Sequence, residues 1–454
     1  MASLAAFLGS LDSALNISFP AITAAFSLEV ISIQWVIIGY VLPHASLLLG
    51  CGRLADVWGH GRVLTAGLVV SVVGFAGCGL APTFAWLVAA RVVQGVGAAL
   101  MSGSAPALVT LAVPPEARGR ALGVLQMSMA AGYAVGPLIG GALVDVFGWR
   151  AVFLFRILPA VLLAWAAASK LFIVQRQDSE QRFDLFGALT LAGSLAVFLF
   201  AISQGRRSGW FSLQVMIPAS LSVIGFATFI VTEKRVSAPI VNLDLFRRWP
   251  FVIANLLGVA ANCARFAVGL LVPYYVIEVL RYPAVTGGTL MLAAAIMTPL
   301  VAPFAGKLSD RFGTAGLSAL GLAVEGLGLW MISRLDGQAD YLSAAAALGL
   351  VGLGLGLFEA PNMSFVMGSI PRNQQGVAGS IANMMRTLGI VVGATGWSML
   401  FDARRQSAAG AIKSGTEGTF VPAFQDVFLA AAVICAIAFV LALFRRQEAQ
   451  FKDK

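Results

Sequence analysis

The chain has 454 residues, of which 59% are hydrophobic and 11% are charged. Soluble globular domains carry about 25% charged residues, so this composition excludes an ordinary soluble protein. The net charge of +9 at pH 7 does not indicate nucleic-acid binding, because the basic residues are scattered over short loops instead of forming one basic face. The composition predicts a polytopic membrane protein.

Apolar stretches long enough to cross a bilayer, about 20 residues each, recur along the whole chain. The expected spans cover residues 1–22, 33–51, 63–81, 84–111, 120–144, 150–173, 184–204, 212–232, 250–278, 284–305, 314–333, 340–361, 376–400 and 424–444. They predict an all-α fold with 14 transmembrane helices. Asp12 interrupts the apolar core of the first span, so we expect a retained helix there and not a cleaved signal peptide.

One eight-residue pattern occurs twice. Residues 52–59 read G-R-L-A-D-V-W-G and residues 306–313 read G-K-L-S-D-R-F-G, each between two apolar runs. Each copy is expected to be a short polar turn between two membrane helices, bent at its glycines. The second copy indicates a duplicated half-molecule, an architecture typical of transporters with a binding site between the halves.

The repeat also predicts the domain layout. Two six-helix halves would place the copies six spans apart, but eight spans separate them, so two spans are inserted. We expect two pseudo-symmetric six-helix bundles at 1–173 and 250–444, an inserted two-helix hairpin at 184–232, a cytoplasmic connection at 233–249 and a tail at 445–454. Lys and Arg residues are more frequent on the loops that share a side with the repeated turns and both termini, which predicts that this side is cytoplasmic.

The sequence predicts neither a metal nor a cofactor. The four cysteines and two histidines have no ligand spacing, and the chain has no G-x-x-x-x-G-K-[ST] phosphate loop. We expect a monomeric, multi-pass protein of the cell membrane that is not an enzyme. Its partners would be a small-molecule substrate, protons as the coupling ion and the lipid bilayer, and no nucleic acid. Isolated charges within spans argue against a channel, which needs a continuous polar stripe, and against an inert scaffold.

Ionisable side chains inside membrane spans are the candidates for function, because each costs about 2.5–3.5 kcal/mol on insertion scales. They are Asp12, Arg91, Arg156, Arg265, Glu325, Glu359 and Arg386. Asp12 lies roughly 17 Å along the first helix, near the middle of the membrane, where a carboxyl group can bind a proton on one side and release it on the other. Asp12 and Arg91 form either a permanent ion pair or a pair that exists in one state only.

The remaining polar residues of the spans are assigned by position. Asn16, one turn after Asp12, is expected to share its face and to contact the substrate. Glu359 either reaches water by snorkelling or forms a second acidic site, whereas Glu325 and Arg156 are expected to be structural. The expected lining of the substrate cavity is Asn16, Gln94, Asn362 and Arg386.

Four motifs resemble the major facilitator superfamily, in particular its fourteen-helix drug:proton antiporters, and the resemblance covers nearly the whole chain. They are Leu11–Pro20 in the first span, Gly52–Arg62 after the second, Arg91–Ala99 in the fourth and Gly132–Gly141 in the fifth. The resemblance implies multidrug efflux by alternating access, with Arg91 in proton transfer. Asp12 and Glu359, as acids within spans, are expected to take part in proton coupling with it. A proton-coupled uptake permease or a facilitator for a metabolite is the alternative. Arg156, where the family often has asparagine, and Glu359 depart from the family pattern.

The resemblance also assigns two moving parts. The repeated turns are expected to gate the cavity, with ion pairs that hold one access state and break in the other, although a static solvated turn is the alternative. The residues of this gate are Gly52, Arg53, Asp56, Gly59, Arg62, Gly306, Asp310, Arg311 and Gly313. The exchanger motif is expected to be a close-packing face with a bend at its proline, formed by Gly132, Gly136, Pro137, Gly140 and Gly141.

Overall fold

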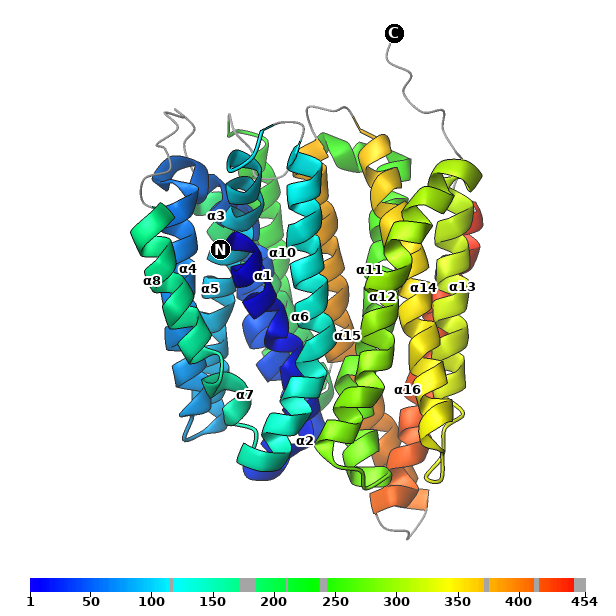
Figure 1. Cartoon of the computed structure of the whole chain (residues 1–454). Coiled ribbons are helices and arrows are strands. Elements are labelled where there is room, and N and C mark those ends of the chain that lie inside the picture. The colour runs from blue at the N-terminus through cyan, green and yellow to red at the C-terminus, as the bar shows by residue number, and fades with distance from the viewer. Residues whose placement is uncertain are drawn as a thin grey trace.

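The computed structural model describes residues 1–114, 117–171, 185–209, 211–236, 243–370, 375–411 and 416–444. Every regular element in these ranges is a helix (Figure 1). Thirteen of the described helices are long and apolar enough to cross a bilayer, which confirms the all-α polytopic fold. The expected span 184–204 corresponds to α9, in which the apolar stretch Leu189–Phe198 is recorded. The expected tail 445–454 lies outside the described residues, as does part of the connection 233–249.

The N-terminal helices form one bundle, in which α5 packs against both α3 and α4. The first span consists of three consecutive segments, and the sixth consists of two. The elements are α1 (Ala2–Ser10), η1 (Leu11–Ser18), α2 (Phe19–Ala25), η2 (Val30–Ile33), α3 (Gln34–Trp58), α4 (His60–Gly79), α5 (Phe84–Leu111), α6 (Arg118–Phe147), α7 (Ala151–Leu154) and α8 (Ile157–Leu171).

The C-terminal helices repeat this packing, because α14 lies against both α12 and α13. The equivalence of these contacts is what a duplicated half-molecule would produce. The elements are η4 (Leu243–Arg247), α11 (Trp249–Tyr274), the π-helical segment η5 (Tyr275–Val279), α12 (Ala284–Phe312), α13 (Thr314–Ile332), α14 (Tyr341–Gly368), α15 (Gln375–Ala411) and α16 (Thr416–Leu443).

The helices α9 (Leu185–Ser208) and α10 (Leu213–Glu233) form a hairpin beside the two bundles. Only 17% of the apolar stretch of α10 is buried, compared with 61% for the stretch Trp249–Val279, so α10 is peripheral and α11 is central. The helix α9 contacts α3 of one bundle and α15 of the other.

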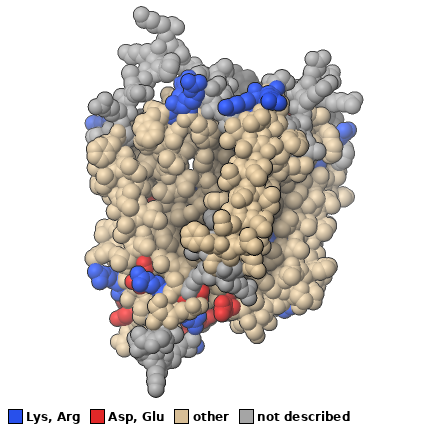
Figure 2. All heavy atoms as spheres, turned by 180° about the vertical axis from the view of Figure 1, so that it is seen from behind, with Lys and Arg blue, Asp and Glu red and all other residues tan. Residues whose placement is uncertain are grey.

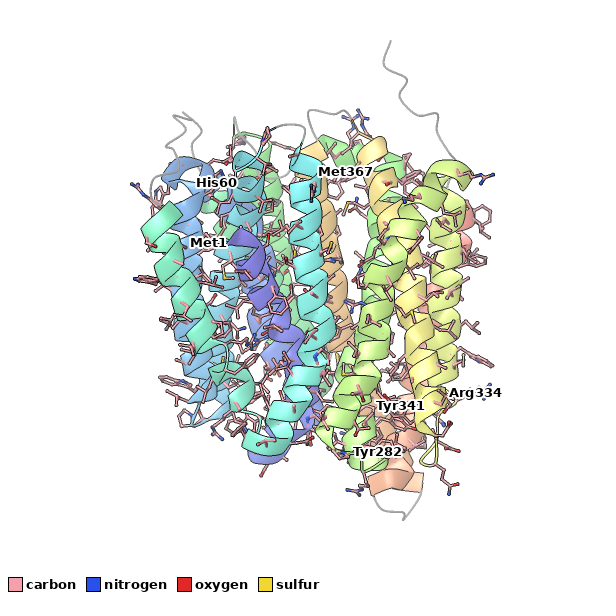
Figure 3. The ribbon with its side chains drawn as sticks, viewed as in Figure 1. Met1, His60, Tyr282, Arg334, Tyr341 and Met367 are labelled. Atoms are coloured by element: carbon pink, nitrogen blue, oxygen red, sulfur yellow. The ribbon has the colours of Figure 1, made fainter. Side chains whose placement is uncertain are left out.

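The two ends of the molecule differ in how the bundles meet. We name them by Gly59, between α3 and α4, and by Asp145, near the end of α6. Figure 3 shows His60 and Met367 near the Gly59 end and Tyr282, Arg334 and Tyr341 near the Asp145 end.

At the Asp145 end a single apolar core joins both bundles, since Phe19 and Ile33 belong to the same cluster as Tyr274 and Phe401. At the Gly59 end the apolar core is divided. One cluster there contains N-terminal residues such as Leu64, and a separate one contains C-terminal residues such as Leu322. The bundles are therefore joined at the Asp145 end and packed separately at the Gly59 end.

The outer surface is suited to lipid. Trp165, Leu158 and Phe304 are 73%, 66% and 72% exposed. Figure 2 shows the charged side chains gathered mainly near the two ends, with a broad uncharged band between them. Such a band is the surface that a membrane-spanning protein presents to acyl chains.

Candidate functional site

The first span changes its helix type where Asp12 lies. The helix α1 ends at Ser10, and the chain continues as the 3₁₀-helix Leu11–Ser18 before α2 begins. Pro20 lies in the first turn of α2, a position that tolerates proline because its missing N–H needs no partner there. The expected span over 1–22 is therefore present as the continuous helical span Ala2–Ala25, with its middle tightened to 3₁₀ geometry.

Asp12 is held by three side chains. Arg91 on α5 binds it through both ends of its guanidinium, with Nη1–Oδ1 and Nη2–Oδ2 distances of 2.9 Å. Arg156, between α7 and α8, donates from Nη1 to Oδ1 at 2.9 Å, and Gln94 donates from Nε2 to Oδ1 at 2.8 Å. The structure thus brings Asp12 and Arg91 together, and it adds a second cation that the sequence interpretation had placed elsewhere.

Two arginines on one carboxylate leave a net charge of +1 in the cluster. The Arg156 side chain is fully buried, and its guanidinium lies 4.5 Å from the ring centroid of Phe75. Its Nη2 has no partner among the described residues. Arg156 was expected to form a helix-packing pair, and the structure places its charge against Asp12. The only sequence signal was a second arginine within a span, which does not say which acid it meets.

Arg91 is fixed on every side. Its Nε donates to the Val36 carbonyl at 3.0 Å, and its guanidinium lies 4.3 Å from the ring centroid of Tyr40. Gly95 on α5 lies directly against the backbone of Tyr40, so the absence of a side chain there lets α3 and α5 approach closely. A lysine in place of Arg91 could not donate to the Val36 carbonyl and to both oxygens of Asp12 at the same time.

Two expected cavity residues have other roles. Gln94 is 3% exposed and is used on both sides, since it donates to Asp12 and accepts from Arg91 Nη1 at 2.8 Å. Asn16 does not share the face of Asp12, because a 3₁₀-helix has three residues per turn and turns residues four apart by about 120°. Its amide lies beside α11, where a Cβ added to Gly269 would come 2.9 Å from Asn16 Nδ2. Asn16 is therefore at the contact between the bundles.

A second charged group lies between α14 and α15. Glu359 and Arg386 are 3.7 Å apart and are 31% and 39% exposed, so Glu359 is partly accessible and has a cationic neighbour. Arg386 also donates to Asn383 at 3.0 Å and lies close enough to His44 on α3 to interact with it electrostatically. This group therefore faces the N-terminal bundle.

His44 connects the second group to the first. Its ring stacks on Tyr40 with centroids 5.8 Å apart, and the Arg91 guanidinium lies over the Tyr40 ring.

Asn362 on α14 is 8% exposed and donates to the Ala254 carbonyl at 3.0 Å. It thereby joins α14 to α11, and its expected place in the cavity lining stays a prediction.

The exchanger motif packs on two partners. Gly132 lies against α1, where an added Cβ would come 2.6 Å from the Phe7 carbonyl oxygen, and Gly136 and Gly140 lie against η1. Gly141 faces the other bundle, where an added Cβ would come 2.5 Å from the Ala284 carbonyl oxygen. Pro137 lies within the helix α6 and contacts Gly288 of α12. The glycines thus place α6 between the first span and α12.

Asp145 joins the two bundles beyond this glycine face. Its carboxylate accepts from the backbone N–H groups of Ala284 and Val285, at 2.9 and 2.8 Å, in the first turn of α12. An acid at a helix N-terminus satisfies N–H groups that lack partners within the helix. The sequence interpretation did not single out Asp145, because its partner lies 139 residues away.

The repeated motif is helical over most of its length. The helix α3 continues to Trp58 and α12 continues to Phe312, and only Gly59 and Gly313 leave the helix, with φ of 93° and 88°. The expected eight-residue turns, including the bends at Gly52 and Gly306, are therefore wrong in extent. A positive φ favours glycine, which explains the last residue of each motif.

The charged residues of the motif have several partners. Asp56 lies 3.4 Å from His60 Nε2, one helical turn further along. Arg62 and Arg311 are exposed and have interactions of their own. The side chains of Arg53 and Asp310 lie outside the described ones, so the gating role of these residues stays a prediction.

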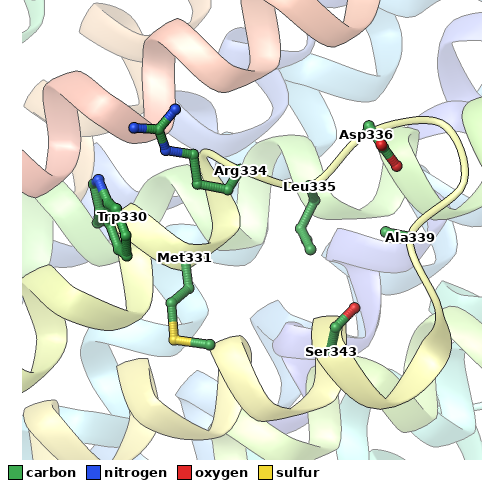
Figure 4. Close-up of a pocket in the computed structure, with 7 residues that line it drawn as sticks. All are labelled: Trp330, Met331, Arg334, Leu335, Asp336, Ala339 and Ser343. Carbon is green, nitrogen blue, oxygen red and sulfur yellow. The ribbon is translucent and has the colours of Figure 1, made fainter.

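The surface pockets are separate from these groups. One, of about 400 Å³, lies between α13 and α14 at the Asp145 end (Figure 4). Its lining residues are Trp330, Met331, Arg334, Leu335, Asp336, Ala339 and Ser343. None of the predicted site residues lines it. In the part of the chain that the structure describes, no group of three or more His, Cys, Asp and Glu side chains could hold a metal ion.

The profile described as Major Facilitator Superfamily matches residues 1–394. The chain is 28% identical over 439 residues to the riboflavin transporter RibZ of Clostridioides difficile, which covers 96% of this chain and 94% of that protein. It is 30% identical over 381 residues to the multidrug resistance protein Stp of Mycobacterium tuberculosis, which covers 83% of this chain and 70% of that protein. The crystal structure of the nucleoside transporter NupG is similar with a TM-score of 0.69 and 12% identity, over 98% of this chain and 99% of that one. This last likeness concerns the fold.

Proposed function

The chain belongs to the major facilitator superfamily and is therefore a secondary transporter, and we propose that it exports hydrophobic or cationic small molecules in exchange for protons. We place it in the cell membrane as a multi-pass protein with both termini cytoplasmic, so that the Gly59 end faces the cytoplasm. Substrate would then leave at the Asp145 end as a proton enters.

The observation that carries this proposal is the position of Asp12. A carboxylate in the middle of the first span binds two arginines of its own bundle. Buried ion pairs are held strongly because removal of one partner leaves an uncompensated charge, which costs about 3–5 kcal/mol. Such a group can couple a change of charge to a change of structure.

The proposed cycle follows from these bonds. Each bond to Asp12 comes from an N–H donor, so a proton that binds Asp12 competes with the arginines. Neutral Asp12 no longer holds the 3₁₀ segment against α5, and the first span becomes free to move with α6, on which it packs. Proton release restores the two ion pairs and returns the segment to its place.

The alternating step would use the contacts between the bundles. In the described state the bundles share one core at the Asp145 end and have separate cores at the Gly59 end. Opening toward the other side requires the contact of α6 with α12 to separate and a new one to form near Gly59. The repeated motifs lie at that end, which suits them to gating.

A proton-coupled uptake permease is the second candidate. The observation that favours it is the similarity to a riboflavin transporter over 96% of this chain and 94% of that protein. Uptake and export would use the same bundles and the same proton-binding carboxyl group. They differ in whether the substrate moves in the same direction as the proton or in the opposite direction.

The test uses the full chain in proteoliposomes with an imposed pH gradient, with ethidium and riboflavin as probes. We expect ethidium to move in the direction opposite to the protons, and we expect its transport to stop when the pH gradient is collapsed. In the Asp12→Asn variant, which cannot release a proton, exchange is expected to fall by at least about tenfold. Movement of riboflavin in the same direction as the protons would support the permease instead.

Controls separate coupling from folding. Asp12→Asn leaves two buried cations unpaired, so its thermal unfolding is measured beside transport. Asp12→Glu restores a carboxyl group and is expected to recover part of the exchange. Asp340→Asn, at an exposed acid before α14, is the matched change of charge and is expected to leave exchange unchanged. Full exchange in a folded Asp12→Asn variant would remove Asp12 from the mechanism.

A further inference from the structure

Glu325 is a fully buried acid without a hydrogen bond. It lies on α13 with 0% of its surface exposed, and neither carboxyl oxygen has a partner among the described residues. It is the twelfth residue of a 19-residue helix, about 17 Å from the helix start and hence near the middle of the span. This depth leaves no path by which the side chain could reach water by snorkelling.

On the side of α14, the helices are packed too closely to admit a polar partner. Gly354 on α14 lies against the backbone of Glu325, and an added Cβ would come 2.6 Å from Glu325 Cα. Gly321 and Gly328 on α13 make the same kind of close approach to α14, on either side of Glu325. The carboxyl group is thus enclosed by helices that touch at their backbones.

An ionised carboxylate in this place would have neither water nor a hydrogen-bond donor. That arrangement is far more costly than a buried neutral carboxyl group. The geometry of the described state therefore fits a protonated Glu325.

Three titratable or charged groups on the neighbouring helices interact electrostatically with Glu325. They are Arg265 on α11, Glu359 on α14 and Cys435 on α16. Arg265 is the only cation among them, and its Nε is buried and also without a partner in the described part of the chain. An acid and a base therefore lie close to each other without pairing.

We propose that Glu325 is a proton-binding site of the C-terminal helices, loaded in the described state and emptied when Arg265 moves onto its carboxyl group. In that step the O–H bond of Glu325 breaks, the proton passes to water, and the carboxylate pairs with the guanidinium, which stays charged throughout. Glu359 is 31% exposed and marks the side from which water can reach the group. The proposal rests on the proton coupling proposed above and adds a second site to it.

The two acids have opposite environments in one state. Asp12 has two cations and is ionised, whereas Glu325 has no partner and is neutral. The two bundles can therefore each carry a proton at a different stage of the cycle. A chain that uses both sites moves one proton more per substrate than a chain that uses Asp12 alone.

The first test reads protonation directly and needs no transport. Infrared spectra of the full-length protein in lipid nanodiscs are compared between wild type and Glu325→Gln at neutral pH. The wild type is expected to show the band of a protonated carboxylic acid that the variant lacks, and the band is expected to shift in deuterium oxide. Absence of the band, or a band that stays unshifted as in a sealed structural acid, would overturn the proposal.

The second test counts protons. Proteoliposomes hold a pH gradient of one unit with the membrane potential clamped at zero, and the steady gradient of ethidium is measured. Loss of one coupled proton lowers this gradient by about tenfold, because one pH unit acting on one proton corresponds to a factor of ten. Glu325→Gln is expected to show this loss, and Asp340→Asn is expected to match the wild type.

Arg265 supplies the variants that keep the proposal testable if Glu325→Gln does not fold. Arg265→Gln removes the cation that receives the carboxylate, so Glu325 keeps its proton and the same tenfold loss is expected. Arg265→Lys keeps the charge and is expected to restore much of the gradient. Equal ethidium gradients in the wild type and in Arg265→Gln would overturn the proposal.

The two proposals can fail separately. If the ethidium gradient of the wild type ignores the pH gradient, the exchange function is wrong, and the infrared band still decides whether Glu325 holds an exchangeable proton. If the wild type responds but Glu325→Gln builds the same gradient, exchange stands and the second site is wrong.

Discussion

Arg91 and Arg156 both bind Asp12, but they do so differently. Arg91 uses Nε, Nη1 and Nη2 to hold Val36, Gln94 and the two oxygens of Asp12. Arg156 makes one bond to Asp12, donates from Nε to the Val152 carbonyl one turn earlier at 3.2 Å, and leaves Nη2 without a partner in the described part of the chain. Hence the planar fork of Arg91 is needed in full, whereas Arg156 contributes mainly a positive charge.

This difference predicts that replacement by lysine reduces exchange far more at Arg91 than at Arg156. Arg91→Lys can keep only some of the bonds, and since a hydrogen bond to a charged group contributes about 1.5–3 kcal/mol, exchange is expected to fall by roughly tenfold to a hundredfold. Arg156→Lys keeps the charge and its one bond, so exchange is expected to stay within about threefold of the wild type. Proton-driven ethidium flux in proteoliposomes measures both. If Arg91→Lys loses as little exchange as Arg156→Lys, a positive charge is all that Asp12 requires of either residue.

At the scale of a single element, α6 is the helix of the N-terminal bundle that packs on α12 of the other bundle. Its glycines face η1 on one side and the start of α12 on the other. Because backbones meet directly there, the first span and α12 are linked through one rigid helix, and a shift of the 3₁₀ segment is transmitted to the contact between the bundles.

Gly136→Leu is therefore expected to abolish exchange. An added Cβ at Gly136 would come 3.0 Å from the Ala14 nitrogen and closer still to Ser13, and overpacking of this kind costs about 1–3 kcal/mol. Gly123→Leu is the matched control on the same helix, since nothing lies within 4 Å of an added Cβ there. Transport and thermal unfolding are measured for both. Full activity in Gly136→Leu would show that this face only fills space.

At the scale of the whole molecule, the balance between the two access states depends on few polar contacts. Asp145 supplies two of them at the joined end, where it caps α12 across the two bundles. Next to it, α6 and α12 meet through glycines, at Gly141 and Gly288, which carry no charge that could respond to a signal.

Asp145→Ala is expected to shift the population toward the state that is open at the Asp145 end. Loss of about 1 kcal/mol from this exposed cap corresponds to a change of roughly fivefold in the equilibrium. Spin labels on the exposed positions Phe147 and Leu342, with the four native cysteines buried, report the separation of the bundles at this end. A longer distance distribution is expected in Asp145→Ala, and Asp340→Asn is the control. An unchanged distribution would mean that the apolar core decides the state.

Much of the fold follows from local patterns. The length and apolar character of the spans predict helices, and each glycine at the end of the repeated motif predicts a break, because both signals are contained in a few neighbouring residues. The extent of the breaks could not be predicted in the same way. Arg53, Leu54 and Ala55 are good helix formers, and their preference prevails over the glycine before them in the structure of α3.

The site was predictable only in part. The cost of burying Asp12 predicts that a cation meets it, but the choice of Arg156 in addition to Arg91 depends on how three helices pack. Likewise, the position of Asn16 depends on a change of helix type that no pattern in Leu11–Ser18 announces. The bond from Asp145 to α12 joins segments that are distant in sequence, and single residues carry no signal of such a pairing.

The hairpin of α9 and α10 makes the two flanks of the boundary between the bundles different. Since α9 touches α3 on one side and α15 on the other, with Trp35 and Phe200 in ring contact at 6.2 Å, it spans the boundary between the bundles along one flank. On the opposite flank α6 meets α12 without any intermediary. When the bundles tilt, the hairpin must therefore move with them or slide along them on this flank. The acyl chains around the hairpin then have to rearrange with every turnover. The speed of such a machine would depend on the fluidity of the lipid in which it works.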